Sequence, residues 1–431
     1  MKVAIIGAGS ASFSRRVMID LMTIEGITPD EVALMDVAED RLDLVSRYGQ
    51  ALIEEREAHT KLTVTTSNRE AVEGARYVVM SIRVGGADPR PADIGIPLKY
   101  GVDQSVGDTV GPGGIFQGLR NAPALLHTAD NMLQVAEPGA MILQHSNPMA
   151  INCWLMNVAR PELPHYGLCH SVQGTSRQLA KYMDVPLEEL EYWVAGINHM
   201  AWFLRLERDG EDLYPLLREK MEDPEIFADN TVRFEIFRHF GYFVTESTRH
   251  MSEYTPWFRD RPEIMEQFDL ESRDVDALDF NKWRARADAM EEELVSDEPL
   301  PGQRSHEYTT MIIEAIENDT PTHVNVSVPN TGLITNLREG CAVEVPCFVD
   351  GRGVHPCYVG ALPEQLAGLN ESNVRSQALA VEAALEGDRD ALYQAIMLDP
   401  LTSAVLSLQE TREMVDEMLE AQRQWLPQFD L

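Results

Sequence analysis

The chain has 431 residues, 44% of them hydrophobic, which is enough to bury the cores of two packed domains. Its 70 acidic and 36 basic residues give a formal net charge of −34, which repels nucleic acid and anionic membrane surfaces. No apolar run approaches the roughly 18 residues of a transmembrane helix, and "MKVAIIGAGS" runs into glycines instead of a signal-peptide cleavage site. Five cysteines without framework spacing are typical of reduced thiols. We therefore expect a cytoplasmic protein that binds neither nucleic acid nor membranes.

Apolar runs alternate with amphipathic helical patterns through about the first 200 residues. The runs "KVAIIG", "EVALMD", "LTVTTS", "ARYVVMSI" and "GAMILQHS" predict five strands, and stretches such as "RLDLVSRYGQALIEE" predict helices between them. This alternation is typical of a parallel sheet with helices on both faces. The sequence thus predicts an α/β fold whose N-terminal part, residues 1–195, is a Rossmann-type domain.

The order of elements loosens after about residue 200. We expect a hairpin around Asp209 and Gly210, helices near 230–241 and 276–296, strands in "HVNVSV" and "AVEVPCFV", and a helical tail from about 361. The sequence has no internal repeat, low-complexity tract or flexible linker. Residues 196–431 are therefore predicted to form a mixed α/β domain that packs on the first and shares a cleft with it.

A glycine-rich turn follows the first predicted strand. In "IIGAGSASF", Gly7, Gly9 and Ser10 lie between a strand and a helix, where a backbone can approach a pyrophosphate, although Ser12 replaces the third glycine of the dinucleotide fingerprint. Asp36 ends the second strand, where a carboxylate binds ribose hydroxyls and repels a 2′-phosphate. The pattern favours NAD over NADP, and the alternative is an ordinary tight turn with a surface aspartate.

Several predicted strands end in polar or glycine-rich segments: "SIRVGG", "HSNPMA", "GLCHSV" and "GINHMAW". Because ligands bind at the carboxyl ends of strands in open α/β sheets, these segments predict one crevice. Its candidate residues are Arg83, Asn147, Cys169, His170, Asn198 and His199.

Residue chemistry alone leaves the role of the cysteine open. A lone cysteine is most often a core residue, and Cys169 with His199 has no CxxC or HxxxH partner to specify a metal site. A nucleophilic Cys169 with His170 as its base is a poor fit, because neighbours on an extended strand point to opposite faces.

Eight motifs are spread along nearly the whole chain: "GAGSASF", "DTVGPGGI", "NPMA", "GLCHSVQGT", "AGINHMAWFL", "GYFVTES", "EYTPWF" and "GCAVEVPC". In their order and spacing they resemble glycoside hydrolase family 4. The Cys-His-Ser-Val form of the central motif is similar to that of its α-galactosidase branch. The resemblance implies hydrolysis of terminal α-galactosides with NAD and a divalent metal.

The resemblance also implies how the cysteine and histidine are used. Cys169 and His199 would ligate the metal, usually manganese, and His170 would assist the leaving oxygen. Ligand chemistry by itself does not predict manganese, because a thiolate with an imidazole suits zinc, cobalt or nickel better.

The implied chemistry is an oxidation followed by an elimination. NAD+ would take a hydride from C3 of the sugar, Tyr254 would remove the acidified C2 proton, the aglycone would leave, water would add, and NADH would return the hydride. Since the usual tyrosine pKa is about 10, the site must favour the phenolate. Tyr242 and Glu253 are alternative bases, His250 lies in the same segment, and Tyr254 could instead be a packed aromatic.

Other substrate contacts are expected around the strand ends. Asp108, in the glycine-rich turn 107–114, is the expected polar contact there, and by resemblance Asn147 contacts sugar hydroxyls. Arg83 and Arg90 are candidate cofactor or sugar contacts, with surface ion pairs as the alternative, and Asn198 is a candidate sugar contact. The family resemblance suggests a homodimer or homotetramer.

Other functions remain open at this stage. An α-galacturonidase or α-glucuronidase of the same family would need a cation facing the uronate carboxylate. A hydroxyacid dehydrogenase would need a buried arginine and no metal, and an NAD-binding sensor would usually carry a DNA-binding module.

Overall fold

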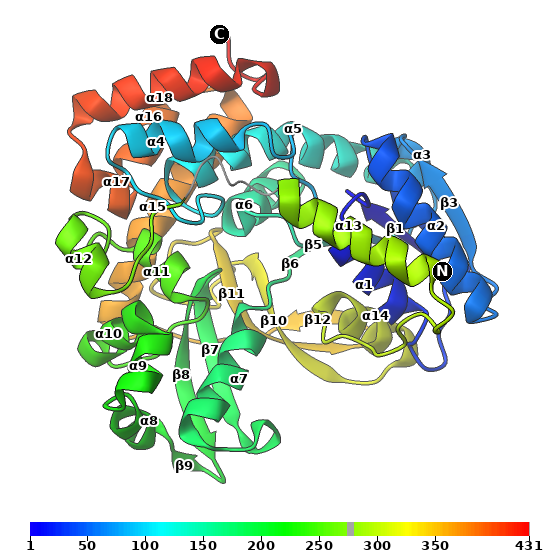
Figure 1. Ribbon diagram of the computed structural model, residues 1–431, viewed down its shortest axis with the longest axis horizontal. Coiled ribbons are helices and arrows are strands. Elements are labelled where there is room, and N and C mark those ends of the chain that lie inside the picture. Colours follow the sequence, from blue (N-terminus) through cyan, green and yellow to red (C-terminus); the bar gives the residue numbers. More distant parts are fainter. Residues whose placement is uncertain (274–279, 431) are drawn as a thin grey trace.

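The computed structural model describes residues 1–273 and 280–430, and its twelve strands form one continuous sheet. The strand order is β3-β2-β1-β4-β5-β6-β10-β11-β7-β8-β9, with β12 paired to β11 (Figure 1). The first six strands in this order are parallel, and every later pairing is antiparallel.

The parallel half has the strand order of a Rossmann fold, as predicted. Its strands read as apolar runs because helices cover both faces, so that residues such as Val3 to Ile5 are fully buried. The sixth strand has only three residues and lies where "GLCHSV" predicts the end of a strand. The bounds are β1 (Lys2–Ile6), β2 (Glu31–Met35), β3 (Lys61–Thr65), β4 (Tyr77–Met80), β5 (Met141–Gln144) and β6 (His165–Gly167).

Two groups of helices flank these strands (Figure 1). One contains α1 (Ala11–Leu21) and α2 (Glu39–Glu55), on which α13 (Phe280–Val295) and α14 (Tyr308–Asn318) pack. The helix expected at 276–296 is α13, and residues 276–279 lie outside the described part. The other group contains α3 (Asn68–Val72), α5 (Gly111–Val135), α6 (Met149–Ala159) and α15 (Glu364–Glu386).

The C-terminal strands extend the same sheet. A single bridge, Ser327 to Gly167, joins β10 to β6. The expected hairpin is present between β8 and β9, where Asp209 and Gly210 have φ of 52° and 77°. The boundary predicted at 195/196 falls inside β7 and stays a prediction. The bounds are β7 (Glu191–Ile197), β8 (Met200–Arg208), β9 (Glu211–Asp212), β10 (Thr322–Pro329), β11 (Ala342–Asp350) and β12 (Gly353–Pro356).

The remaining helices lie outside the two groups above, and several of them pack on other helices. None of the helices in the described residues combines the length and apolarity needed to span a bilayer. The bounds of these remaining helices are as follows: the π-helix η1 (Pro91–Gly95), α4 (Ile96–Lys99), α7 (Ser171–Met183), η2 (Leu187–Glu189), α8 (Tyr214–Lys220), α9 (Pro224–Asp229), α10 (Thr231–Phe240), α11 (Thr248–Tyr254), α12 (Pro262–Gln267), α16 (Arg389–Met397), α17 (Pro400–Val405), α18 (Leu408–Gln422) and η3 (Arg423–Trp425).

A buried ion pair ties α5 to η1 and α18. Arg120 donates from Nη1 and Nη2 to the two carboxylate oxygens of Asp93 at 2.8 and 2.7 Å. Gln422 donates to the same carboxylate at 3.0 Å. Both charged side chains are almost completely buried, so each charge depends on the other for its solvation.

We expect Arg120→Leu to lower the free energy of unfolding by about 3 to 5 kcal/mol, because it leaves the Asp93 carboxylate buried and unpaired. Urea unfolding measures this difference. The matched control is Arg160→Leu, which breaks a partly exposed pair with Asp130 and should cost about 1 kcal/mol or less. Equal losses in the two variants would contradict the role given to the buried pair.

Candidate active site

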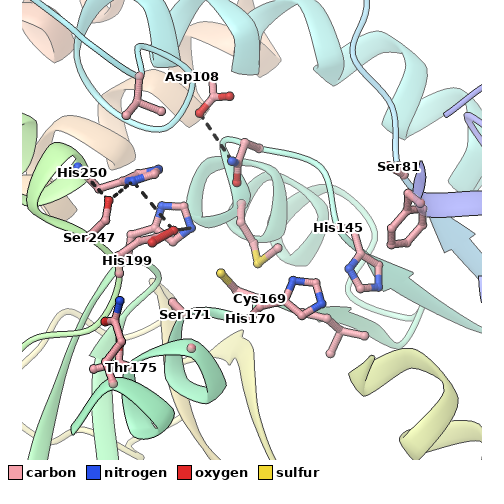
Figure 2. A pocket seen from close by; sticks show the side chains of 18 residues that line it. Ser81, Asp108, His145, Cys169, His170, Ser171, Thr175, His199, Ser247 and His250 are labelled. Carbon is pink, nitrogen blue, oxygen red and sulfur yellow. Dashed lines mark hydrogen bonds and ion pairs between the residues drawn. The ribbon is translucent and has the colours of Figure 1, made fainter. Parts of the chain in front are cut away.

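A cavity of about 550 Å³ opens at the carboxyl ends of the central strands. Residues that follow β4, β5 and β6 line one part, and the turn between β7 and β8 and the start of α11 line the other (Figure 2). Of the predicted site residues, those lining the cavity are Asp108, Asn147, Cys169, His170 and His199. The predicted crevice therefore exists.

The glycine-rich turn lies at the same edge of the sheet, beside this cavity. Gly7 has φ of 85°, and a Cβ there would clash with the carbonyl of Ser81. Gly9 donates its amide to Asp36 Oδ2 at 2.8 Å, and a Cβ at Gly9 would lie 2.8 Å from the same oxygen. Ser10 is the N-cap of α1. A bare backbone turn at a helix start beside an acid fits the pyrophosphate and ribose of a dinucleotide.

The donors around His199 fit a divalent cation. His199 is 3% exposed, and among the described residues its Nδ1 has no hydrogen-bond partner. Glu246 and His250 lie beside it, with ligand atoms of all three within 4.8 Å of one another. Cys169 lines the same cavity, and burial, with the charges of Glu344 and Glu246, raises the pKa of its thiol to about 12. The assignment of Cys169 and His199 to the metal stays a prediction.

His170 is held by a carboxylate that the sequence analysis missed. Its Nε2 lies 2.6 Å from Oε2 of Glu307, and Arg16 donates to Oε1 of the same residue at 2.8 Å. Although burial acts to raise it, the hydrogen bond and charge of His170 lower the pKa of Glu307 to about 2. Half of the His170 side chain is exposed, at the N-cap of α7. Glu307 precedes α14, and no local spacing signals this contact.

Tyr254 lies behind the cavity wall. Its side chain is buried, its hydroxyl donates to the carbonyl of Asn198 at 3.5 Å, and its ring centroid is 6.3 Å from that of His199. Burial raises the pKa of Tyr254 well above its usual value. Tyr242 packs edge-on against Tyr214 and does not line the cavity. The assignment of Tyr254 as the base stays a prediction.

Glu253, the other alternative base, holds the glycine-rich loop before α5. Its Oε1 accepts from the amide of Val106 at 2.6 Å, and its Oε2 accepts from that of Gly107 at 3.1 Å. The side chains of Gln104 and Ser105 add donors at 3.3 Å. With both oxygens occupied and 1% exposure, Glu253 positions the loop that carries Asp108.

Polar groups near Asp108 form a connected set. Arg83 Nη2 donates to Asp108 Oδ2 at 2.9 Å, and Asn147 donates to Oδ1 at 3.5 Å. Arg90 is buried, with Nη1 4.0 Å from Asp108. Asn198 is also buried and donates to Glu344 at 3.2 Å. The side chains of Arg83, Arg90 and Asn198 are not among those that line the cavity.

Comparisons with known proteins agree with this architecture. The family model "Family 4 glycosyl hydrolase" matches residues 2–185, and "Family 4 glycosyl hydrolase C-terminal domain" matches 194–402. An α-galactosidase of Bacillus subtilis (strain 168) is 38% identical over 99% of both chains, and one of Rhizobium meliloti (strain 1021) is 36% identical over 99% of this chain and 89% of that protein. A 6-phospho-α-glucosidase from gut microorganisms, solved in complex with NAD and Mn²⁺, covers 100% of this chain and 99% of its own, with a TM-score of 0.84 and 22% identity. The chain belongs to glycosyl hydrolase family 4.

Proposed function

We propose that this glycoside hydrolase removes terminal α-galactosyl groups from small sugars, using NAD and a divalent metal. The two α-galactosidases similar over nearly the whole chain support the sugar. The NAD and Mn²⁺ of the 6-phospho-α-glucosidase structure, together with the glycine turn and the donors around His199, support the cofactors. Family membership speaks against the dehydrogenase and sensor alternatives.

The charges of the residues that line the cavity are the observation from which we choose between a neutral and a negatively charged substrate. Among the described residues that line the cavity, Asp108 and Glu246 are carboxylates and none is lysine or arginine. Arg83, the cation beside Asp108, is already paired with it. A uronate or a sugar phosphate would therefore meet carboxylates without a lysine or arginine side chain in the described lining to face its own charge. A neutral galactoside fits this lining better than a galacturonide, a glucuronide or a 6-phosphoglucoside.

The residues of the site have separate roles in the reaction. When bound, NAD+ supplies a reversible hydride acceptor and the divalent ion supplies a Lewis acid. Glu307 accepts a hydrogen bond from His170 Nε2, which orients that imidazole for proton donation to the leaving oxygen. Tyr254 accepts the C2 proton, and because burial raises its pKa, it depends on a nearby cation.

The other predicted residues bind and orient. Gly7, Gly9, Ser10 and Asp36 hold the dinucleotide, and Asp108 and Asn147 bind sugar hydroxyls. Arg83 and Arg90 fix the orientation of Asp108. Asn198 forms the turn between β7 and β8 together with His199, and so helps to position that histidine. Assembly as a homodimer or homotetramer and a cytoplasmic location remain predictions.

A panel of p-nitrophenyl glycosides tests the substrate. With NAD+, Mn²⁺ and a thiol reductant present, we expect kcat/KM for the α-galactoside to exceed that for the α-galacturonide by at least about a hundredfold, because no lysine or arginine of the described lining faces the uronate. Omitting each cofactor in turn should remove the activity. A preference for the galacturonide would reject the proposed substrate.

Isotope incorporation tests the mechanism. If Tyr254 exchanges the C2 proton, galactose released in heavy water should carry deuterium at C2, as measured by NMR or mass spectrometry. Tyr254→Phe should suppress exchange and turnover together, and Tyr242→Phe is the matched control. Product without C2 deuterium, formed at full rate without NAD+, would assign the enzyme to direct displacement.

Replacing Asp36 tests the cofactor site. Asp36→Ala removes a charged acceptor for ribose hydroxyls, so the NAD+ dissociation constant should rise about tenfold to a hundredfold, while the sugar KM at saturating NAD+ stays close to that of the wild type. Asp40→Ala, an exposed acid in the first turn of α2, is the control. Unchanged cofactor affinity in Asp36→Ala would move the ribose contact elsewhere.

A further inference from the structure

We propose that Glu246 and His250 join His199 in a two-histidine, one-carboxylate site for the divalent metal. This inference rests on the metal dependence in the proposed function. It adds two ligands from the segment that begins α11, both of which line the active-site cavity.

The three side chains converge without bonding directly. Glu246 Oε1 lies 3.8 Å from His199 Nε2 and 3.8 Å from His250 Nδ1. These separations exceed those of normal hydrogen bonds. They match ligand atoms that share one ion, because two ligands at about 2.1 Å from a metal lie about 3 to 4 Å apart. The histidine rings are also close, with centroids 4.8 Å apart (Figure 2).

Backbone pairing holds this convergence in place. Thr245 donates its amide to the carbonyl of Ala201 at 2.8 Å, and the Ala201 amide donates to Thr245 Oγ1 at 3.1 Å. These bonds fix the segment before α11 alongside β8, so that Glu246 reaches the turn bearing His199. Both His199 and Glu246 have left-handed backbones, with φ of 64° and 76°. Such backbones are uncommon outside glycine and occur often at functional sites.

A buried nitrogen in the group points to a ligand. His199 is 3% exposed, and within the described residues its Nδ1 has no hydrogen-bond partner. A buried polar atom without a partner costs free energy unless something binds that atom, so Nδ1 is a second ring nitrogen, besides the Nε2 near Glu246, at which His199 can take a ligand. His250 Nδ1 has Ser247 Oγ at 2.9 Å, so coordination through that nitrogen would replace this hydrogen bond.

The donor chemistry also favours the larger set. A thiolate and one imidazole suit zinc, whereas two imidazoles, a carboxylate and open positions are typical of non-haem iron and similar ions. Glu246 supplies a carboxylate oxygen, which is a ligand type that suits manganese. Manganese(II), which accepts nitrogen and oxygen ligands, therefore fits this group better than it fits Cys169 with His199 alone.

The test measures Mn²⁺ binding to the metal-free protein, without sugar, by calorimetry or by electron paramagnetic resonance. We expect Glu246→Gln and His250→Gln each to weaken Mn²⁺ binding about a hundredfold. Glu246→Asp, which keeps a carboxylate, should bind more tightly than Glu246→Gln. The matched controls are Glu235→Gln and His239→Gln, an exposed pair of the same residue types on α10 with a 3.1 Å contact, and both should bind Mn²⁺ as the wild type does.

NAD+ affinity and the thermal unfolding midpoint show whether each variant is folded. Wild-type Mn²⁺ affinity in folded Glu246→Gln and His250→Gln, with loss of binding in Cys169→Ser, would overturn the proposal. Weakened binding in the first two variants supports it even if the wild type fails to hydrolyse α-galactosides, because metal affinity is measured apart from activity. That failure would reject only the proposed function.

Discussion

The close approach of β6 to β10 is the constraint on which the site depends. A Cβ on Gly167 would lie 2.6 Å from Cys153 Sγ and 2.9 Å from Ser327 Cβ, so only glycine lets these strands meet. Through that contact the sheet continues into β10, β11 and β7, and the turn bearing His199 follows β7. The segment with Cys169 and His170 leaves β6 directly after Gly167. One glycine thus keeps two distant parts of the chain in register around one cavity.

Negative charge around the cavity makes its chemistry depend on a cation. Glu246 and Asp108 line it, and Glu344 lies behind Asn198, where burial raises the pKa of its carboxyl to about 7. The same surroundings favour a protonated thiol at Cys169 and a neutral phenol at Tyr254. A divalent cation would reverse both preferences, since it stabilises thiolate and phenolate. Metal binding and activation of the base are therefore expected to be linked.

The sequence predicts the parallel half of the fold well because its central strands, such as β1, β2 and β4, are buried and appear as nearly uninterrupted apolar runs. The three residues of β6 are too few to form such a run, and this strand is predicted only from the polar segment "GLCHSV" at its end. The sequence predicts a strand ending in polar residues at "GINHMAW", but this segment contains a turn between β7 and β8, with His199 at positive φ. The polar strand ends correctly predicted the cavity. Glu307 and Glu246 were missed because their partners are distant in the sequence, and only the folded sheet brings them together.

Two histidines at the same edge of the sheet have different chemical roles because their local contacts differ. The rings of His145 and His170 are 6.3 Å apart. His145 lies against the hydroxyl of Thr309, and burial lowers the pKa of its imidazole to about 4, so it is neutral at pH 7. His170 instead meets the ionised carboxylate of Glu307, which accepts a hydrogen bond and so favours a proton on Nε2. With Nε2 bonded to Glu307, Nδ1 is the ring nitrogen left to donate to a leaving oxygen, and the exposed half of the side chain and its place in the cavity lining give it access.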